Sequence, residues 1–285
     1  MKVINLLIGC ILLVLFNSCE LINPEEPQPV YLHLDKFVLS TDYASQGTSS
    51  NALTDAWVYI DQQLAGAYEV PATVPLLLED GPHEISIRGG IHVDGQVNLH
   101  DQYDYIDFFD TIQFFKKGEV THIQPRVKYI DGAKFEYIED FDDGGIDFTR
   151  DPNCDTIFST TATNAFEGPY SAIAYLDTAR PTLIATTKLS YPLSKSTVNM
   201  LELNYKSTNS FNVGLSRVKF TGAEEKVIYI SLKPSETWNK IYINLSSIVS
   251  SSTDAVGFKL LFTAKLDEGN TSSTIMIDNI KLLHN

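Results

Sequence analysis

Few side chains in this sequence have the types and spacing that catalysis needs. The chain contains neither the Gly-x-Ser-x-Gly elbow of serine hydrolases nor a glycine-rich loop for phosphates. The segment His83–Ile87 lacks the second histidine of a zinc protease helix, and the six histidines form no ligand-spaced cluster. Paired carboxylates for glycoside hydrolysis remain an alternative among the 36 acidic residues, because their separation depends on the fold. We expect a protein that is not an enzyme.

The chain has three cysteines, Cys10, Cys19 and Cys154. Cys10 lies inside an apolar segment that ends at Cys19. If cleavage removes Cys10 and the thiol of Cys19 is modified, Cys154 is the only free thiol and no intramolecular disulfide can form. Asp151 and Asp155 lie close to Cys154 and disfavour a thiolate. We therefore expect Cys154 to be a small buried side chain and not a nucleophile.

The first residues predict an export signal. Lys2 supplies a positive charge, and Val3–Phe16 is an apolar run with few polar interruptions that ends in small residues before Cys19. This order is typical of a signal peptide. A transmembrane helix, the alternative, needs about 20 apolar residues, and this run is shorter. Residues 1–18 are therefore predicted to be cleaved.

The segment Leu15-Phe16-Asn17-Ser18-Cys19 resembles a bacterial lipobox, although Phe16 and Asn17 differ from the commonest residues there. The resemblance implies that Cys19 becomes the N-terminal residue and carries acyl chains such as palmitate. The implied partner is the lipid bilayer, and the implied location is the outer membrane, at the cell surface or the periplasmic face. The alternative is an unmodified thiol near a cleavage site.

Residues 19–29 are predicted to be a tether. The segment Glu20–Pro29 contains three prolines and three glutamates. Proline favours extended polyproline II and the like charges repel, so the spacer is stiff and spans about 3.1 Å per residue. The acidic residues after Cys19 also resemble surface-export signals of some lipoproteins.

Length and charge restrict the architecture and partners of the chain beyond the tether. At about 100–200 residues per domain, 285 residues suggest two domains. A formal net charge of −15 repels phosphates, so we expect no nucleic-acid partner.

Residues 30–130 show the short alternating runs of β-strands, as in Ala56–Ile60 and His83–Arg88, separated by turn residues. The segment 55–90 resembles the Ig-like or carboxypeptidase-regulatory-like β-sandwich modules of exported proteins. We therefore predict an Ig-like sandwich here.

Residues 135–285 also alternate, as in Met200–Tyr205 and Lys240–Leu245. The ordered segments Ile138–Asp142, Phe166–Ser171 and Met276–Leu282 resemble the galactose-binding-like jelly roll of many carbohydrate-binding modules. The predicted fold class is therefore all-β, with two β-sandwiches. The resemblance implies a structural calcium between the first and last strands, for which Glu139, Asp142 and Asp278 are the candidate ligands. The alternative is that these acids are solvated or cap a turn.

The same resemblance implies sugar binding, which needs aromatic rings that stack on pyranose faces beside polar hydrogen-bonding groups. Trp238 is also a candidate, although at the start of a strand we favour a packing role for it. The candidate binding residues are Tyr170, Tyr205, Trp238 and Tyr242, with Tyr175 and Tyr229 also available.

The segment 101–110 places bulky apolar residues among acids. It is either an exposed partner-binding loop or, as we favour, an alternating strand with one buried face.

The sequence therefore predicts a non-catalytic, membrane-anchored lipoprotein that displays a glycan- or protein-binding β-sandwich at the cell envelope. The alternatives are a structural or assembly component of an envelope complex that binds no sugar, and a weak hydrolase. The partners are glycans or envelope proteins, and no cofactor is expected apart from the calcium.

Cys19→Ser should abolish palmitate labelling and release the mature protein from the detergent-extracted membrane fraction, because the acyl chains have no other attachment point. Metabolic labelling with fractionation measures both effects, and Cys154→Ser is the control. An unlabelled parent protein, with the Cys19→Ser variant still in the membrane, would refute the anchor.

Overall fold

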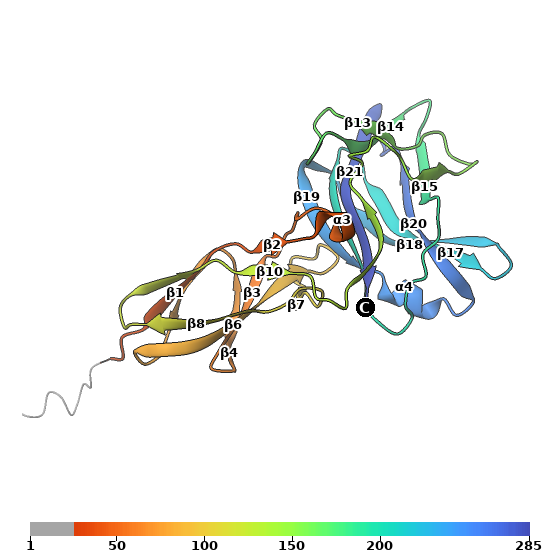
Figure 1. The fold of residues 1–285 in the computed structure, drawn as a ribbon. Coiled ribbons are helices and arrows are strands. Elements are labelled where there is room, and N and C mark those ends of the chain that lie inside the picture. Colours follow the sequence, from red (N-terminus) through yellow and green to blue (C-terminus); the bar gives the residue numbers. More distant parts are fainter. Residues whose placement is uncertain (1–25) are drawn as a thin grey trace, which may run out of the picture.

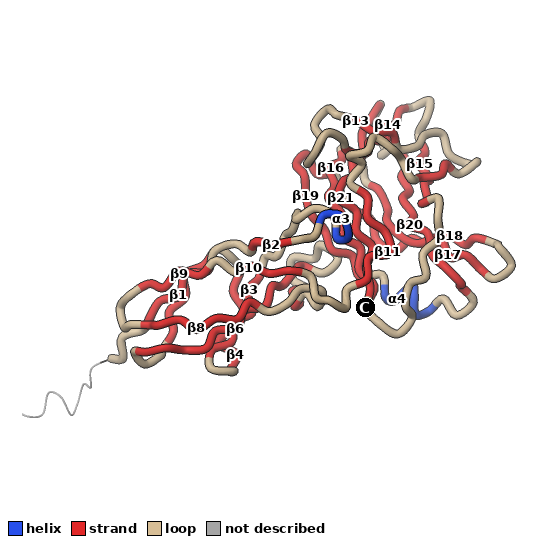
Figure 2. The backbone as a smooth tube through the Cα atoms, viewed as in Figure 1, coloured by secondary structure: helices blue, strands red, loops and turns tan. Residues whose placement is uncertain are grey.

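A computed structural model describes residues 26–285, so the predicted signal peptide, Cys19 and residues 19–25 of the tether lie outside the described residues. Strands make up most of the described chain, with two short helices, α3 (Tyr43–Gln46) and α4 (Ser246–Ser251) (Figure 2). Among these residues no helix is long and apolar enough to cross a bilayer. The described chain is all-β, as the sequence predicts.

Ten strands form the first sandwich (Figure 1). Two small sheets, β5-β1-β9 and β10-β2, accompany a larger sheet, β4-β3-β6-β7, in which β8 also pairs with β6. The strands are β1 (Val30–Leu34), β2 (Val38–Ser40), β3 (Asp55–Ile60), β4 (Gln63–Glu69), β5 (Ala72–Leu76), β6 (Gly81–His92), β7 (His100–Gln102), β8 (Phe109–Phe115), β9 (Val120–Ile123) and β10 (Arg126–Lys128).

Side chains alternate across the larger sheet of the first sandwich. On β6, Ile85 and Ile87 are buried in the core with Leu32 of β1, whereas Ser86 and Arg88 are only partly buried. The alternation that the sequence predicts for this segment is therefore confirmed. Its consequence is that the polar residues of β6 line the outer face of the sheet.

Eleven antiparallel strands form the second sandwich, which is of the predicted jelly-roll type. One sheet has the order β13-β14-β21-β16-β19, with β11 also on β21, and the other has the order β12-β15-β20-β17-β18. The strands are β11 (Lys134–Glu139), β12 (Phe148–Arg150), β13 (Ser159–Thr161), β14 (Ser171–Asp177), β15 (Thr182–Thr187), β16 (Asn199–Ser207), β17 (Phe211–Lys219), β18 (Glu224–Leu232), β19 (Ser235–Asn244), β20 (Ala255–Lys265) and β21 (Ser272–His284).

The core of the second sandwich lies between its two sheets. It is rich in aromatic rings, and Phe148 packs edge to face on Phe262 at 5.5 Å between ring centroids. Cys154 is 3% exposed, so the expectation of a buried thiol is confirmed.

The two sandwiches lie end to end, and the described chain begins at the end of the first sandwich that is far from the second (Figure 1). At the junction Met200, Tyr242 and Leu283 of the second sandwich join the apolar core of the first. The hairpin between β6 and β7 also reaches β19, where Val93 bridges to Tyr242. The junction is therefore a continuation of the hydrophobic core.

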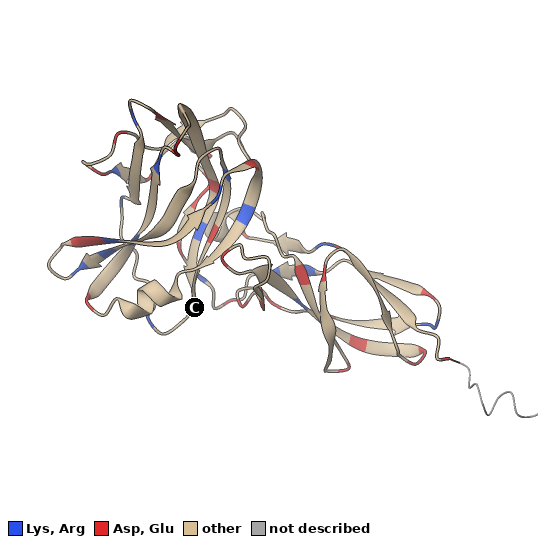
Figure 3. Cartoon of the chain, turned by 180° about the vertical axis from the view of Figure 1, so that it is seen from behind, with Lys and Arg blue, Asp and Glu red and all other residues tan. Residues whose placement is uncertain are grey.

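A buried carboxylate lies in this junction. Glu202 on β16 is fully buried and accepts hydrogen bonds from Tyr103 Oη at 2.5 Å and Tyr129 Oη at 2.8 Å, both from the first sandwich. Lys240 Nζ lies 3.1 Å from Glu202 Oε2, and acidic and basic residues lie on neighbouring strands there (Figure 3). Burial alone would raise the pKa of Glu202, but Lys240 and Lys281 lower it below its ordinary value.

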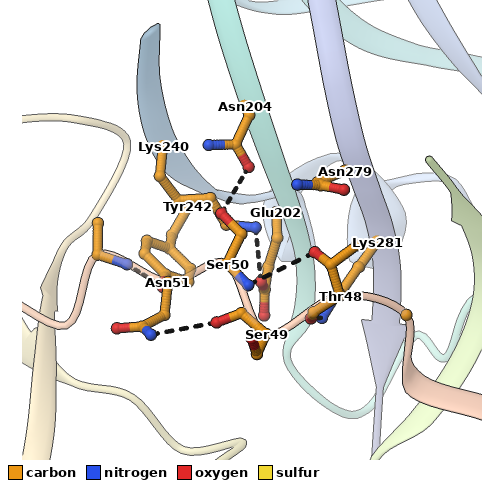
Figure 4. Close-up of polar contacts among 12 residues, drawn as sticks. Thr48, Ser49, Ser50, Asn51, Glu202, Asn204, Lys240, Tyr242, Asn279 and Lys281 are labelled. Atoms are coloured by element: carbon orange, nitrogen blue, oxygen red, sulfur yellow. Dashed lines mark hydrogen bonds and ion pairs between the residues drawn. The ribbon is translucent and has the colours of Figure 1, made fainter. Parts of the chain in front are cut away.

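A polar segment of the first sandwich lies across the same sheet of the second (Figure 4). Lys281 Nζ donates to Thr48 O at 2.6 Å, and Ser50 Oγ donates to Asn204 Oδ1 at 3.0 Å. Burial lowers the pKa of Lys281 to about 8, although the charge of Glu202 opposes this shift. These contacts fix the position of one sandwich relative to the other.

Glu202→Ala should lower the free energy of unfolding by about 3–5 kcal/mol, because the change leaves Lys240 buried without its countercharge. Urea denaturation at pH 7 measures the loss. Glu225→Ala, which breaks a surface contact with Lys219, is the matched control and should cost less than about 1 kcal/mol. Equal losses in the two variants would contradict the role of Glu202.

Candidate functional site

A groove of about 700 Å³ lies on the outer face of the larger sheet of the first sandwich. Neighbouring strands place its residues side by side, because Tyr59 on β3 is the register partner of Ser86 on β6, which in turn is the partner of Asp110 on β8. A volume of this size lies within the range of about 300–1,000 Å³ that is usual for small-ligand sites.

Aromatic rings form one wall of the groove. Phe108 is 41% exposed, and its ring lies edge-on to Tyr59 at 6.2 Å between centroids. The guanidinium of Arg88 lies over the Phe108 ring at 5.0 Å. Ile112, which is 67% exposed, extends the apolar surface. An apolar ligand face could therefore pack here without any rearrangement of the core.

Polar groups converge on the same wall. Arg88 Nη1 donates to Gln102 Oε1 at 3.3 Å, and Gln102 Nε2 donates to Tyr59 Oη at 3.0 Å. Arg88 Nη2 pairs with Asp104 at 2.8 Å, and Ser86 Oγ donates to Asp110. Arg88 Nε is buried and lacks a hydrogen-bond partner among residues 26–285.

This arrangement combines ring surface with planar hydrogen-bonding groups. An amide, a guanidinium and a carboxylate can each bind two adjacent hydroxyl groups, while a ring packs on C–H groups. A ligand with both surfaces, such as a pyranose, matches this chemistry.

Of the predicted calcium ligands, Asp142 lies close enough to Asp278 for its charge to help raise the pKa of that carboxyl. Two groups of three His or acidic side chains within residues 26–285 have ligand atoms all within 4.8 Å, and neither contains Glu139, Asp142 or Asp278. Ser171 Oγ donates to Asp278 Oδ2 at 2.5 Å, and Phe141 N donates to Glu139 Oε1 at 2.9 Å. Asp142 Oδ1 is buried and has no hydrogen-bond partner among residues 26–285. Calcium binding by these three residues stays a prediction.

The predicted sugar-binding aromatic residues do not form one surface, although Tyr205 and Tyr242 line the same cavity of about 200 Å³ at the junction. Tyr242 is 2% exposed and packs on Tyr103 at the junction, so its ring is not available to a ligand. Tyr205 packs edge to face on Phe211. Tyr170 is 37% exposed, and Trp238 packs on the half-exposed Phe166.

Of the predicted sugar-binding residues, Tyr170 is therefore exposed, whereas Trp238 and Tyr205 are partly buried. Trp238 Nε1 also donates to Asn164 O at 3.2 Å, so its indole is held against a neighbouring loop.

The segment 101–110 matches neither interpretation alone. It is not one strand, because β7 ends at Gln102 and β8 begins at Phe109. In the intervening loop Tyr103 and Tyr105 are buried, whereas Phe108 is exposed in the groove. The sequence singles out this segment as part of a possible site. It does not indicate Tyr59 and Arg88, which lie beside Phe108 because of the register between β3, β6 and β8.

The expectation that the histidines do not cluster is wrong in three dimensions. His92 and His100 are register partners on β6 and β7, and His33 and His122 are partners on β1 and β9. Each pair has a nearby aspartate. The expectation considered only spacing along the sequence, whereas pairing between strands brings together histidines that are distant in the sequence.

No protein-family model matches this chain, and no curated protein does. Among solved structures, the CBM22-1 xylan-binding domain of Xyn10C from Paenibacillus barcinonensis is 12% identical with a TM-score of 0.39, covering 54% of this chain and 97% of its own. The family 11 carbohydrate-binding module of the cellulase Lic26A-Cel5E from Clostridium thermocellum is 16% identical with a TM-score of 0.39, covering 52% and 93%. These values do not establish a shared ligand.

The free energy of unfolding should fall between about pH 4 and pH 7, in part because of Glu139 and Asp278. Burial raises the pKa of each carboxyl to about 7, so the folded chain binds more protons than the unfolded chain between about pH 4 and pH 7. Stability is therefore lost as the pH rises through that window.

Asp278→Asn should reduce this fall by about 1–3 kcal/mol, since one pKa unit corresponds to about 1.4 kcal/mol. Urea denaturation at several pH values measures it, with the exposed Glu236→Gln as control. An unchanged slope in Asp278→Asn would show that this carboxyl titrates normally.

Proposed function

We propose that this chain is a non-catalytic, lipid-anchored protein of the outer membrane that binds glycan in the groove of its first sandwich. Acyl chains on Cys19 attach it to the bilayer, and the tether holds the first sandwich clear of the surface. The observation that supports glycan as the ligand is the groove, where Tyr59 and Phe108 stand beside Arg88, Gln102 and Asp110.

The chemistry of the groove favours a neutral or weakly charged sugar. Arg88 already has Asp104 as its countercharge, so the groove does not present a free cation to an anionic group. The remaining hydrogen-bonding groups of the groove, on Gln102, Ser86 and Asp110, suit the hydroxyl groups of a ligand.

The second sandwich contributes rigidity and a secondary surface. The segment Thr48–Asn51 covers part of its β16 and β21 face, as Figure 4 shows. Trp238 and Phe166 pack on each other and offer a smaller aromatic surface, and Phe166 borders the segment Thr48–Asn51. We propose that the groove of the first sandwich is the main site.

An assembly role without sugar binding is the second candidate. The observation that favours it is the apolar side of β8, where Ile112 and Phe114 are 67% and 66% exposed. Exposed apolar surface of this kind commonly marks a protein interface.

A glycan array followed by calorimetry on the mature Cys19→Ser chain tests the proposal. Phe108→Ala and Arg88→Ala should each weaken glycan binding at least about 10-fold, since each loss exceeds about 1.4 kcal/mol. Trp238→Ala is the matched aromatic control outside the groove and should bind like the parent.

Binding that is lost only in Trp238→Ala would place the site on the second sandwich. An absence of glycan binding, together with co-purification of an envelope protein that Ile112→Ser and Phe114→Ser abolish, would favour the assembly role.

A further inference from the structure

Three adjacent strands of the first sandwich bring two histidines and an aspartate together. His92 on β6 lies opposite His100 on β7, and Asp55 on β3 pairs with Gly90, two residues before His92. One ligand atom from each of Asp55, His92 and His100 lies within 4.8 Å of the others. The group is therefore built on paired strands and not on a mobile loop.

His100 has more acceptors than a neutral ring can satisfy. Its Nδ1 lies 3.0 Å from Asp55 Oδ2, and its Nε2 lies 2.7 Å from Val97 O. A neutral imidazole carries one N–H, so only one of these contacts can be a hydrogen bond. Either a second proton or a cation must therefore lie between Nδ1 and the carboxylate.

His92 contributes an unused ligand atom. Its ring lies 4.3 Å from the His100 ring, nearly perpendicular to it. Its Nε2 is buried and has no hydrogen-bond partner in the part of the chain that the structure describes. Buried ring nitrogens normally have partners, so this atom is free to bind another group.

The surroundings of the group favour positive charge. Asp55 is 5% exposed, and Glu69, its register partner on β4, is close enough for its charge to act on His100. Val97 O holds the outer nitrogen of His100, which is the usual role of a carbonyl behind a metal-bound imidazole.

We propose that Asp55, His92 and His100 bind a divalent transition-metal ion, with Zn²⁺ as the best match. Imidazole and carboxylate are the usual protein ligands of Zn²⁺, at about 2.0–2.1 Å. Three protein ligands leave a fourth position, and the side chain of His100 is 37% exposed, so water can occupy it.

The site would fix the hairpin that joins the two sandwiches. His92 and His100 are at the base of this hairpin, and Asp94 lies within it. Asp94 N donates to Tyr242 O at 2.8 Å, and Asn244 N donates to Asp94 Oδ1 at 2.9 Å. An ion at the base would hold these junction contacts in place.

The second histidine pair is a weaker candidate and a useful control. His33 Nδ1 already has Thr73 Oγ1 as a partner at 2.7 Å. The side chain of Asp35 is 45% exposed, and His122 is exposed. The proposed site contains a buried aspartate and this one does not.

Zinc binding is best measured by calorimetry on the untagged mature Cys19→Ser chain in which His33 and His122 are both alanine. This protein should bind one equivalent of Zn²⁺, and Zn²⁺ should raise its melting temperature. His92→Ala or His100→Ala in the same background should weaken binding at least 10-fold. Imidazole ¹⁵N shifts on titration with Zn²⁺ should change at His92 and His100 in the parent chain.

Circular dichroism establishes whether each variant is folded. His100→Ala changes a partly exposed side chain, so this variant still tests the proposal if His92→Ala misfolds. The proposal is overturned if the His33 and His122 double variant binds no Zn²⁺, or if the folded His100→Ala variant binds it as tightly as its parent.

Discussion

The arrangement of this molecule depends on one carboxylate that has been removed from water. A buried charge is tolerated only when opposite charge and hydrogen-bond donors surround it. Glu202 belongs to the second sandwich, its ammonium partner Lys240 belongs to the same sheet, and its hydroxyl donors Tyr103 and Tyr129 belong to the first. Neither sandwich alone can satisfy this group. The two bodies therefore have one favoured relative placement, in which the charge is compensated.

This placement makes one sheet face of the second sandwich unavailable to a ligand. The sheet face that carries Glu202, Lys281 and Tyr242 is turned towards the first sandwich, and the segment Thr48–Asn51 lies across it. The open aromatic and polar surface lies instead on the first sandwich, in the groove of Tyr59, Arg88 and Phe108.

Local alternation of apolar and polar residues predicts many of the strands correctly. Alternation in His83–Arg88 and Met200–Tyr205 places strands where β6 and β16 run, because period two is a property of each strand by itself. The candidate site was harder to predict. Phe108 and Asp110 belong to a conspicuous segment, but Tyr59 and Arg88 join them only through the register of β3, β6 and β8.

Two other expectations show the same limit. Alternation indicates that Tyr242 and Ile241 face opposite sides of β19, but it does not reveal that the first sandwich covers the outer side. The carboxylate of Asp278 is a candidate ion ligand by type, but its sequence neighbours do not reveal that Ser171, 107 residues away, donates to it in the folded chain. Neighbours of this kind come from tertiary structure alone.

Strand β21 has a consequence for how the chain matures. It lies in the interior of its sheet, with β16 on one side and β14 and β11 on the other, and Lys134 pairs with His284, 150 positions further along. Closing contacts over such distances is slow. Until this strand is in place, the apolar surfaces of β11, β14 and β16 stay exposed. Partly folded chains therefore present unpaired apolar strands to one another for longer than chains whose contacts are local, which favours aggregation during folding.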